Sequence, residues 1–174
     1  MRVDTGRGRI KADVVPALTF RKYVYFYSSS LESHEEGIRF LNSAGLPITN
    51  FPKHHIANGE AKNAEGRTNG WYKPTVRIFK NARNRLINDG TIPKDSCPSY
   101  SVECLLYNAL DACFGTTWQN TYISVVNYLW TLPFDNCFCQ NGIIPLFGTS
   151  SVQWNTDAAT RFLSGLRDLW KNWS

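Results

Sequence analysis

An aspartate lies inside an otherwise apolar segment close to the N-terminus. Asp13 belongs to residues 10–15, which are β-branched or apolar apart from Lys11 and Asp13 itself, and Pro16 follows them. Such a segment is typical of a strand, in which Asp13 and Val15 share one face. Burying a carboxylate is costly unless a metal, a cation or hydrogen bonds compensate its charge. Asp13 is therefore either a candidate metal ligand or a solvated side chain on an edge strand.

A row of basic and polar residues recurs at helical spacing in the middle of the chain. Lys73, Arg77, Lys80 and Asn84 are four, three and four residues apart, which stacks them on one side of a helix. Arginine offers a fork of donors and lysine a point charge, so such a row can grip a polyphosphate. A solvated helix face without a ligand is the alternative.

The segment that begins at Pro98 combines hydroxyl groups with an aromatic ring. Ser99 and Tyr100 stand where a helix is expected to begin, and the free backbone N–H groups of a helix N-terminus favour anions. Tyr100 could stack on a base or donate its hydroxyl group, and simple packing is the alternative. His54 and His55 show neither metal spacing nor a nucleophile partner, so we expect solvent exposure or a structural hydrogen bond.

The elements that must position these residues begin with short strands. Strands are predicted at residues 10–15, 23–27 and 37–41, with a turn at residues 42–45, and they would form a small antiparallel sheet. Residues 50–70 are polar and lack a sustained period. We therefore expect a long loop there, of the kind that is often functional or mobile.

Helical periodicity dominates the rest of the chain. Helices are predicted at residues 73–88, from about residue 98 to residue 113, at residues 118–132, and after a capping region at residues 155–157. The sequence thus predicts an α+β fold, with a small antiparallel sheet followed by a helical bundle. The side chains expected to face the core are Val76, Phe79, Ala82, Leu86, Val102, Leu105, Leu106, Ala109, Leu110, Cys113, Tyr122, Val125, Val126, Leu129, Phe162, Leu163, Leu166, Leu169, Trp170 and Trp173.

Composition excludes several classes of protein. The 174 residues are 43% hydrophobic and 19% charged, which is typical of a globular chain and excludes a disordered one. No apolar run reaches the roughly 20 residues that span a bilayer, and the first residues do not resemble a secretory signal. We therefore expect a cytoplasmic protein without a membrane partner. The net charge is +5, and basic residues concentrate between Lys62 and Arg85, which indicates an anionic partner.

Five cysteines are present, an odd number. Cys137 and Cys139 are close together, but their C-x-C spacing is too short for the usual zinc pair. We expect reduced and mostly buried thiols, with a zinc site as the lesser alternative.

Several segments in the same order resemble a known family. They are similar to the cyclic-GMP-AMP-synthase/DncV-like nucleotidyltransferases of bacterial anti-phage defence, relatives of oligoadenylate synthetase, and the resemblance covers the latter part of the family's length. The segments are residues 11–17, residues 21–23, residues 50–54 with Asn58 and residues 62–63, residues 73–83, and residues 98–105.

The resemblance implies roles for the candidate residues. It places Asp13 as the third metal-binding carboxylate, which would orient the attacking hydroxyl group through Mg²⁺. It places Arg77 and Lys80 on the triphosphate of the donor nucleotide. Ser99 and Tyr100 would hold phosphate and base, and Lys73 and Lys62 are weaker assignments of the same kind.

The same resemblance implies two parts and an incomplete active site. Residues 1–60 would be strands and a loop of a partial nucleotidyltransferase palm, and residues 61–174 a helical C-terminal domain like that of oligoadenylate synthetase. The family's first two carboxylates belong to a D-x-D that follows a G-S motif, and these 174 residues contain neither motif. Because two-metal phosphoryl transfer needs several carboxylates, we expect no turnover from this chain alone.

Three functions are compatible with these observations. The first is part of an ATP-using transferase that joins nucleoside triphosphates into cyclic or linear second messengers, with the missing lobe in a second chain or an exposed face covered by self-association. The second is a catalytically inert module that binds nucleotide or RNA, although nucleic acid is not the favoured partner. The third is a scaffold without a ligand.

Overall fold

The computed structural model describes residues 2–3, 12–150 and 152–172, and of residues 2, 3, 12 and 13 it describes the backbone alone. The chain forms two compact units, one ending at Pro52 and the other beginning at Lys53. No helix among the described residues is long and apolar enough to cross a membrane.

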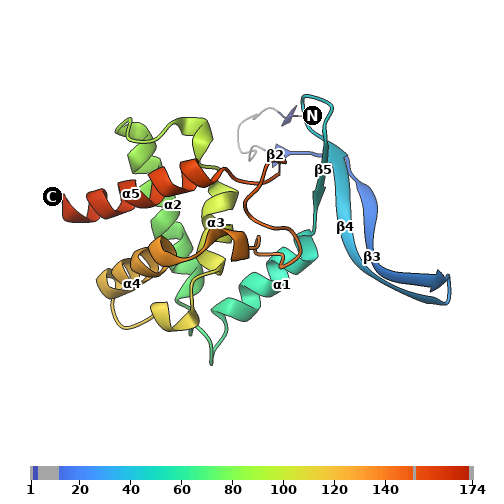
Figure 1. The fold of residues 1–174 in the computed structure, drawn as a ribbon, viewed down its shortest axis with the longest axis horizontal. Helices are drawn as coiled ribbons and strands as arrows, with labels where there is room; N and C mark the ends of the chain where they lie inside the picture. The colour runs from blue at the N-terminus through green and yellow to red at the C-terminus, as the bar shows by residue number, and fades with distance from the viewer. Residues whose placement is uncertain (1, 4–11, 151, 173–174) are drawn as a thin grey trace. The chain divides into compact units, whose positions relative to one another are not determined.

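The first unit is built from antiparallel strands, as the sequence predicts (Figure 1). β1 (Arg2–Val3) pairs with β2 (Ala12–Asp13). A second sheet has the order β3–β4–β5, formed by β3 (Leu18–Ser28), β4 (Leu31–Leu41) and β5 (Pro47–Asn50). Both strands of the β3–β4 hairpin are longer than predicted, because polar residues at the start of β4 pair with β3 without an apolar alternation to reveal them.

The turn between β4 and β5 lies where the sequence predicts it. The side chain of Asn42 accepts hydrogen bonds from the backbone N–H groups of Ala44 and Leu46, each at 2.9 Å. Gly45 has φ 75°, a left-handed conformation that favours glycine. These contacts reverse the chain and set the register of β5 on β4.

The second unit is helical. Its helices are α1 (Pro52–Asn63), α2 (Tyr72–Asn88), α3 (Ser99–Tyr107), α4 (Trp118–Thr131) and α5 (Thr156–Lys171). Short 3-10 turns lie at Lys94–Ser96, Asp111–Cys113 and Phe134–Asn136. The α+β fold with a sheet followed by a helical bundle is therefore confirmed.

The expected loop at residues 50–70 is wrong, because most of this range belongs to α1. The buried residues of α1 are Gly59 and Lys62, so this helix presents a glycine and a lysine where an amphipathic helix presents apolar side chains. The hydrophobic period that reveals most helices is absent here.

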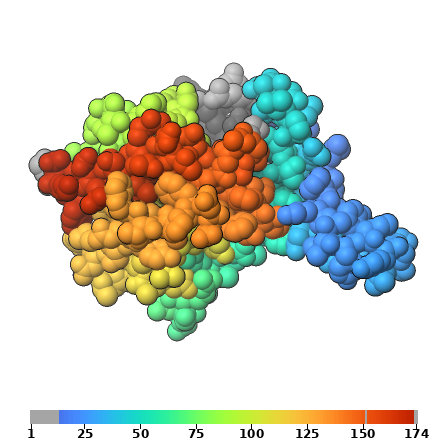
Figure 2. Space-filling view, in the orientation of Figure 1, coloured from blue at the N-terminus to red at the C-terminus, as the bar shows by residue number. Residues whose placement is uncertain are grey.

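α2 packs against α3, α4 and α5 and is the central helix of the second unit (Figure 1). α4 and α5 lie against each other on the face that Figure 2 shows. Most of the predicted core residues are buried, as expected from their periodicity. Asn155 caps α5 as predicted, since its side chain accepts a hydrogen bond from the N–H of Ala158 at 3.0 Å.

α3 is shorter than predicted, and three of the predicted core residues are not fully buried. α3 ends at Tyr107, because the amide of Asn108 then donates to the carbonyl oxygens of Cys104 and Phe138, at 2.7 and 2.8 Å. Beyond this end, Leu110 is exposed and Cys113 is only partly buried. Trp170 is 38% exposed, and Trp173 lies outside the described residues.

The cysteines are free thiols, as predicted, and four of them are buried: Cys97, Cys104, Cys137 and Cys139. Within the described ranges, no group of three or more His, Cys, Asp or Glu side chains could hold a metal ion.

Candidate functional site

The basic row predicted on one helix is present on α2. Val76, Phe79, Ala82 and Leu86 are buried on the inner face of this helix. The predicted cationic row lies elsewhere on the helix surface, with Arg77 exposed and Lys80 partly buried. The helix therefore uses its apolar face for the core and leaves its cations accessible.

Three of the predicted cations line one cleft of about 190 Å³. α1, α2, α3 and a loop after α4 together form its walls. The lining residues are Gly59, Tyr72, Lys73, Val76, Arg77, Lys80, Glu103 and Gln140. A small polar cleft with convergent cations is a suitable form for an anion-binding site.

Glu103 is the acidic residue of this cleft, and no local sequence pattern singles it out. Its Oε2 atom lies 2.6 Å from Nζ of Lys80, and its Oε1 atom lies 3.2 Å from Nε2 of His55. The hydrogen bond with His55, together with Lys80, lowers the pKa of Glu103 to about 2 although partial burial opposes the shift. Glu103 is thus ionised at neutral pH and neutralises Lys80.

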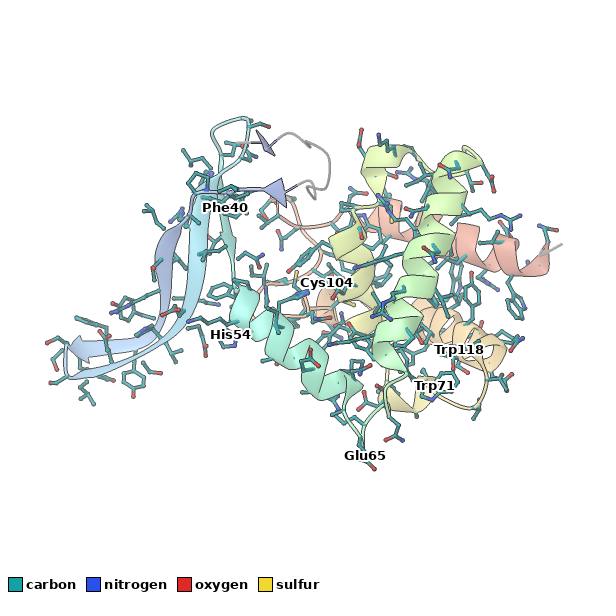
Figure 3. The ribbon with its side chains drawn as sticks, turned by 180° about the vertical axis from the view of Figure 1, so that it is seen from behind. Phe40, His54, Glu65, Trp71, Cys104 and Trp118 are labelled. Carbon is teal, nitrogen blue, oxygen red and sulfur yellow. The ribbon has the colours of Figure 1, made fainter. Side chains whose placement is uncertain are left out.

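His55 lies on α1 and not in a loop. Its expected structural hydrogen bond is present as the contact with Glu103, and its side chain is 18% exposed. Its Nδ1 atom is buried without a hydrogen-bond partner among the described atoms. His54, the neighbouring histidine, is labelled near the start of α1 in Figure 3.

Gln140 lines the cleft and is held in place by hydrogen bonds. Its side chain accepts a hydrogen bond from the hydroxyl group of Tyr72 and donates one to the carbonyl oxygen of His55 at 2.8 Å. Its own carbonyl oxygen accepts from Asn58 at 2.8 Å. A Cβ atom at Gly59 would lie 2.5 Å from Nε2 of Gln140, so only glycine allows this close approach.

Lys73 and Arg77 are the other two cations that line the cleft, besides Lys80. Lys73 forms an ion pair with Glu60 of α1, in which both side chains are substantially exposed. Such exposed pairs are weak and exchange easily for another anion. Arg77 is exposed one helical turn further on, where its guanidinium can offer two parallel hydrogen bonds to a phosphate.

Ser99 and Tyr100 lie in the first turn of α3, as predicted, and are exposed, but they do not line this cleft. The ring of Tyr100 stacks on His55, with centroids 5.2 Å apart. Its hydroxyl group contacts the thiols of Cys104 and Cys139, and burial raises the pKa of Tyr100. Tyr100 therefore packs on His55 while the residue stays 36% exposed, and its role in holding a base stays a prediction.

Lys62 is enclosed in the helical unit and also lies outside the cleft. It is 2% exposed, and its Nζ atom donates to the carbonyl oxygen of Ala109 at 2.7 Å and to Asp111 at 2.9 Å. Burial lowers the pKa of Lys62, and the hydrogen bond with Asp111 opposes the shift. Arg67 shares the same carboxylate at 2.7 Å, so the structure gives Lys62 a stabilising role.

The side chain of Asp13 lies outside the described residues. Its backbone belongs to β2, where it pairs with Arg2. The proposed metal-binding role of Asp13 therefore stays a prediction.

The second unit matches a known domain. The model of the cGAS/DncV-like nucleotidyltransferase C-terminal helical domain matches residues 57–171. The chain is 45% identical over 165 residues to the cyclic UMP-AMP synthase of Rhodothermus marinus, covering 94% of this chain and 56% of that protein. It is 38% identical over 168 residues to the cyclic nucleotide synthase CdnE01 of Staphylococcus haemolyticus, covering 94% and 55%.

Solved structures agree with these relatives. The structure of the Rhodothermus marinus CdnE c-UMP-AMP synthase with Apcpp and Upnpp matches with a TM-score of 0.89 and 44% identity, over 99% of this chain and 57% of that one. The Elizabethkingia meningoseptica CdnE cyclic dinucleotide synthase with GTP and Apcpp matches with a TM-score of 0.83 and 28% identity, over 97% and 61%. The chain spans little more than half the length of these relatives. Together with the family match, they show that the chain belongs to the cGAS/DncV-like nucleotidyltransferases.

Proposed function

We propose that the chain forms the donor-nucleotide-binding part of a synthase that joins nucleoside triphosphates into cyclic or linear second messengers for anti-phage defence in the cytoplasm. The observation that carries the proposal is the cleft in which Lys73, Arg77 and Lys80 converge. Relatives of this chain bear the names of cyclic nucleotide synthases, and solved structures of two of them contain nucleoside triphosphates or their analogues.

The charges of the cleft suit a triphosphate. Three cations on successive turns of α2 face a ligand with several negative charges, and two of them are paired with Glu60 and Glu103. A phosphate that displaces a carboxylate from lysine exchanges one ion pair for another, so little interaction energy is lost. Arg77 adds a planar fork of donors between the two lysines.

Catalysis needs more acidic groups than these residues supply. In the proposed reaction, a ribose hydroxyl group attacks the α-phosphorus and pyrophosphate leaves, and the family's chemistry uses Mg²⁺. The described residues contain no cluster that fits such ions. We propose Asp13 as one ligand, and the remaining carboxylates would come from polypeptide outside these 174 residues, in the same longer protein or in a second chain.

Binding of a non-hydrolysable ATP analogue, measured by isothermal titration calorimetry, tests the proposal. Each of Arg77→Ala and Lys80→Ala should weaken binding by about tenfold, because each removes a charge-assisted contact. Lys94→Ala removes an exposed lysine that does not line the cleft and should leave binding unchanged. Equal affinity in the wild type and all three variants would refute the proposed site.

Incubation of this chain with nucleoside triphosphates and Mg²⁺ tests whether catalysis needs carboxylates from outside these 174 residues. We expect no product, because D-x-D and G-S are absent from the sequence. Robust product formation by the purified chain would show that the carboxylates present suffice.

An inert nucleotide-binding or RNA-binding module is the second candidate. The cations of the cleft can bind an anion without a metal ion, and no carboxylate cluster among the described residues could hold one. It differs in one measurable way: binding would be equally strong with Mg²⁺ and with a chelator, and no added chain would restore turnover.

A further inference from the structure

A second and larger hollow of about 750 Å³ lies on the helical unit. Its walls come from α2, from the first turns of α4 and from the end of α5. The lining residues are Ile78, Asn81, Ala82, Arg85, Trp118, Gln119, Tyr122 and Trp170. None of them lines the cleft of Lys73, Arg77 and Lys80. We call this hollow the tryptophan groove.

Aromatic rings dominate the tryptophan groove. Trp118 and Trp170 are 47% and 38% exposed, so both indoles keep much of their surface available. The ring of Tyr122 stacks on Trp170, with centroids 5.4 Å apart and planes 23° apart. Figure 3 labels Trp118 beside Trp71, and these two rings are 4.2 Å apart at their centroids. Such a surface offers stacking positions for a planar ring.

The tyrosine hydroxyl group is not available for a ligand. It donates a hydrogen bond of 2.9 Å to the carbonyl oxygen of Leu166, so Tyr122 presents its ring. The polar groups left to orient a ligand are the amides of Asn81 and Gln119 and the guanidinium of Arg85. A largely apolar hollow with a few polar groups, within about 300–1,000 Å³, is the usual form of a small-molecule site.

The positive charge of Arg85 in the groove favours a negatively charged ligand. Among the described residues that line it, Arg85 is the one charged side chain, and no carboxylate lines it. Arg85 pairs with Asp89 at 3.5 Å, with side chains 44% and 54% exposed. A pair this exposed contributes little, so a ligand anion can share or replace it at small cost.

We propose that the tryptophan groove binds a small planar aromatic anion, with the ring against Trp118 and Trp170 and the anionic group at Arg85. The volume of about 750 Å³ suits a small molecule. The proposal rests on residues that the nucleotide cleft does not use, and it holds whether or not the cleft binds a triphosphate.

A matched pair of probes tests it. Naphthalene-1-sulfonate and naphthalene-1-sulfonamide have the same ring and differ in charge. In a titration followed by the indole N–H signals in NMR spectra, both probes should shift the signals of Trp118 and Trp170, and the sulfonate should bind more tightly. Trp130 is 43% exposed and contacts Arg167 outside the groove, so its signal should stay in place.

Three variants assign the contacts. Trp118→Ala and Trp170→Ala should each weaken sulfonate binding by about tenfold, as expected for the loss of one stacking partner. Arg85→Gln should weaken the sulfonate and leave the sulfonamide unchanged. The control Trp130→Ala should bind as the wild type does, and melting temperatures would show that each variant is folded.

Two results would overturn the proposal. One is sulfonate binding that is the same in Trp118→Ala, Trp170→Ala and the wild type. The other is self-association that both substitutions abolish while neither probe binds, since the groove would then be covered by a second copy of the chain.

Discussion

Glu103 neutralises the lysine that the proposed triphosphate would need. Its carboxylate lies 2.6 Å from Nζ of Lys80 and is ionised. We expect Glu103→Gln to bind a non-hydrolysable ATP analogue roughly threefold more tightly or better, because an attached anion no longer competes for Lys80. Calorimetry would measure the change. Asp168→Asn removes the same charge from an exposed pair with Lys171 and should have no effect; weaker binding by Glu103→Gln would show that the carboxylate helps to hold the nucleotide.

The same carboxyl group makes stability depend on pH. Its pKa is lowered from 4.5 to about 2 in the folded protein, so the folded state favours the charged form. Its contribution is therefore complete above about pH 4.5 and is lost as the pH falls toward 2. Thermal melting of the wild type and Glu103→Gln should show a difference in melting temperature that shrinks over this range. A difference that is constant from about pH 5 to about pH 2.5 would contradict the assignment.

We expect a substitution of Lys62 to lower the stability of the protein without changing nucleotide binding. Because its ammonium group bonds to Ala109 and Asp111 inside the helical unit, Lys62→Met should lower the free energy of unfolding by about 1–3 kcal/mol. Urea denaturation would measure this loss. Affinity for the ATP analogue should stay unchanged in the folded fraction, and a large loss of affinity would instead support the nucleotide contact that the family resemblance implies.

Individual residues show how far sequence reasoning reaches. Lys73, Arg77 and Lys80 can be predicted to share one side of a helix because their spacing is local. Glu103 cannot be placed in this way, since its partners His55 and Lys80 are 48 and 23 residues away. Such pairings depend on tertiary packing, which local spacing does not encode.

At the scale of elements, apolar periodicity decides what can be predicted. α2 and α4 bury apolar rows, and both ends of each helix lie within about a residue of the prediction. α1 buries a glycine and a lysine, so its sequence indicates a loop although it forms a helix. α3 ends early because Asn108 takes up carbonyl groups at its end, although apolar residues continue beyond it.

A substitution at Gly59 tests why α1 lacks a buried apolar row. Alanine is the better helix former by about 1 kcal/mol, but its Cβ atom would lie 2.5 Å from Gln140. We expect Gly59→Ala to be destabilising overall by about 1–3 kcal/mol and to weaken binding of the ATP analogue, because Gln140 lines the cleft. Ala57→Ser adds one atom at an exposed position of the same helix and should do neither. A more stable Gly59→Ala protein would show that Gln140 moves aside freely.

At the scale of the whole molecule, the β3–β4 hairpin carries an unusual amount of exposed apolar surface. Tyr25, Phe26 and Tyr27 are 44%, 58% and 78% exposed, and Val24 and Leu31 are 67% and 55% exposed. β3 is also an edge strand of its sheet, as far as the described residues go. Surfaces and edges of this kind favour association with another polypeptide.

We therefore expect the 174-residue chain to self-associate through this hairpin at high concentration. Phe26→Lys with Tyr27→Lys should reduce the association, because two charges would have to be desolvated at the contact. Sedimentation velocity over a wide range of concentration would measure it. Ser29→Lys with Ser30→Lys adds the same charge at the hairpin turn and should weaken association less. If the wild type stays monomeric throughout, the exposed aromatic residues do not drive self-association, and a different polypeptide becomes the expected partner of β3.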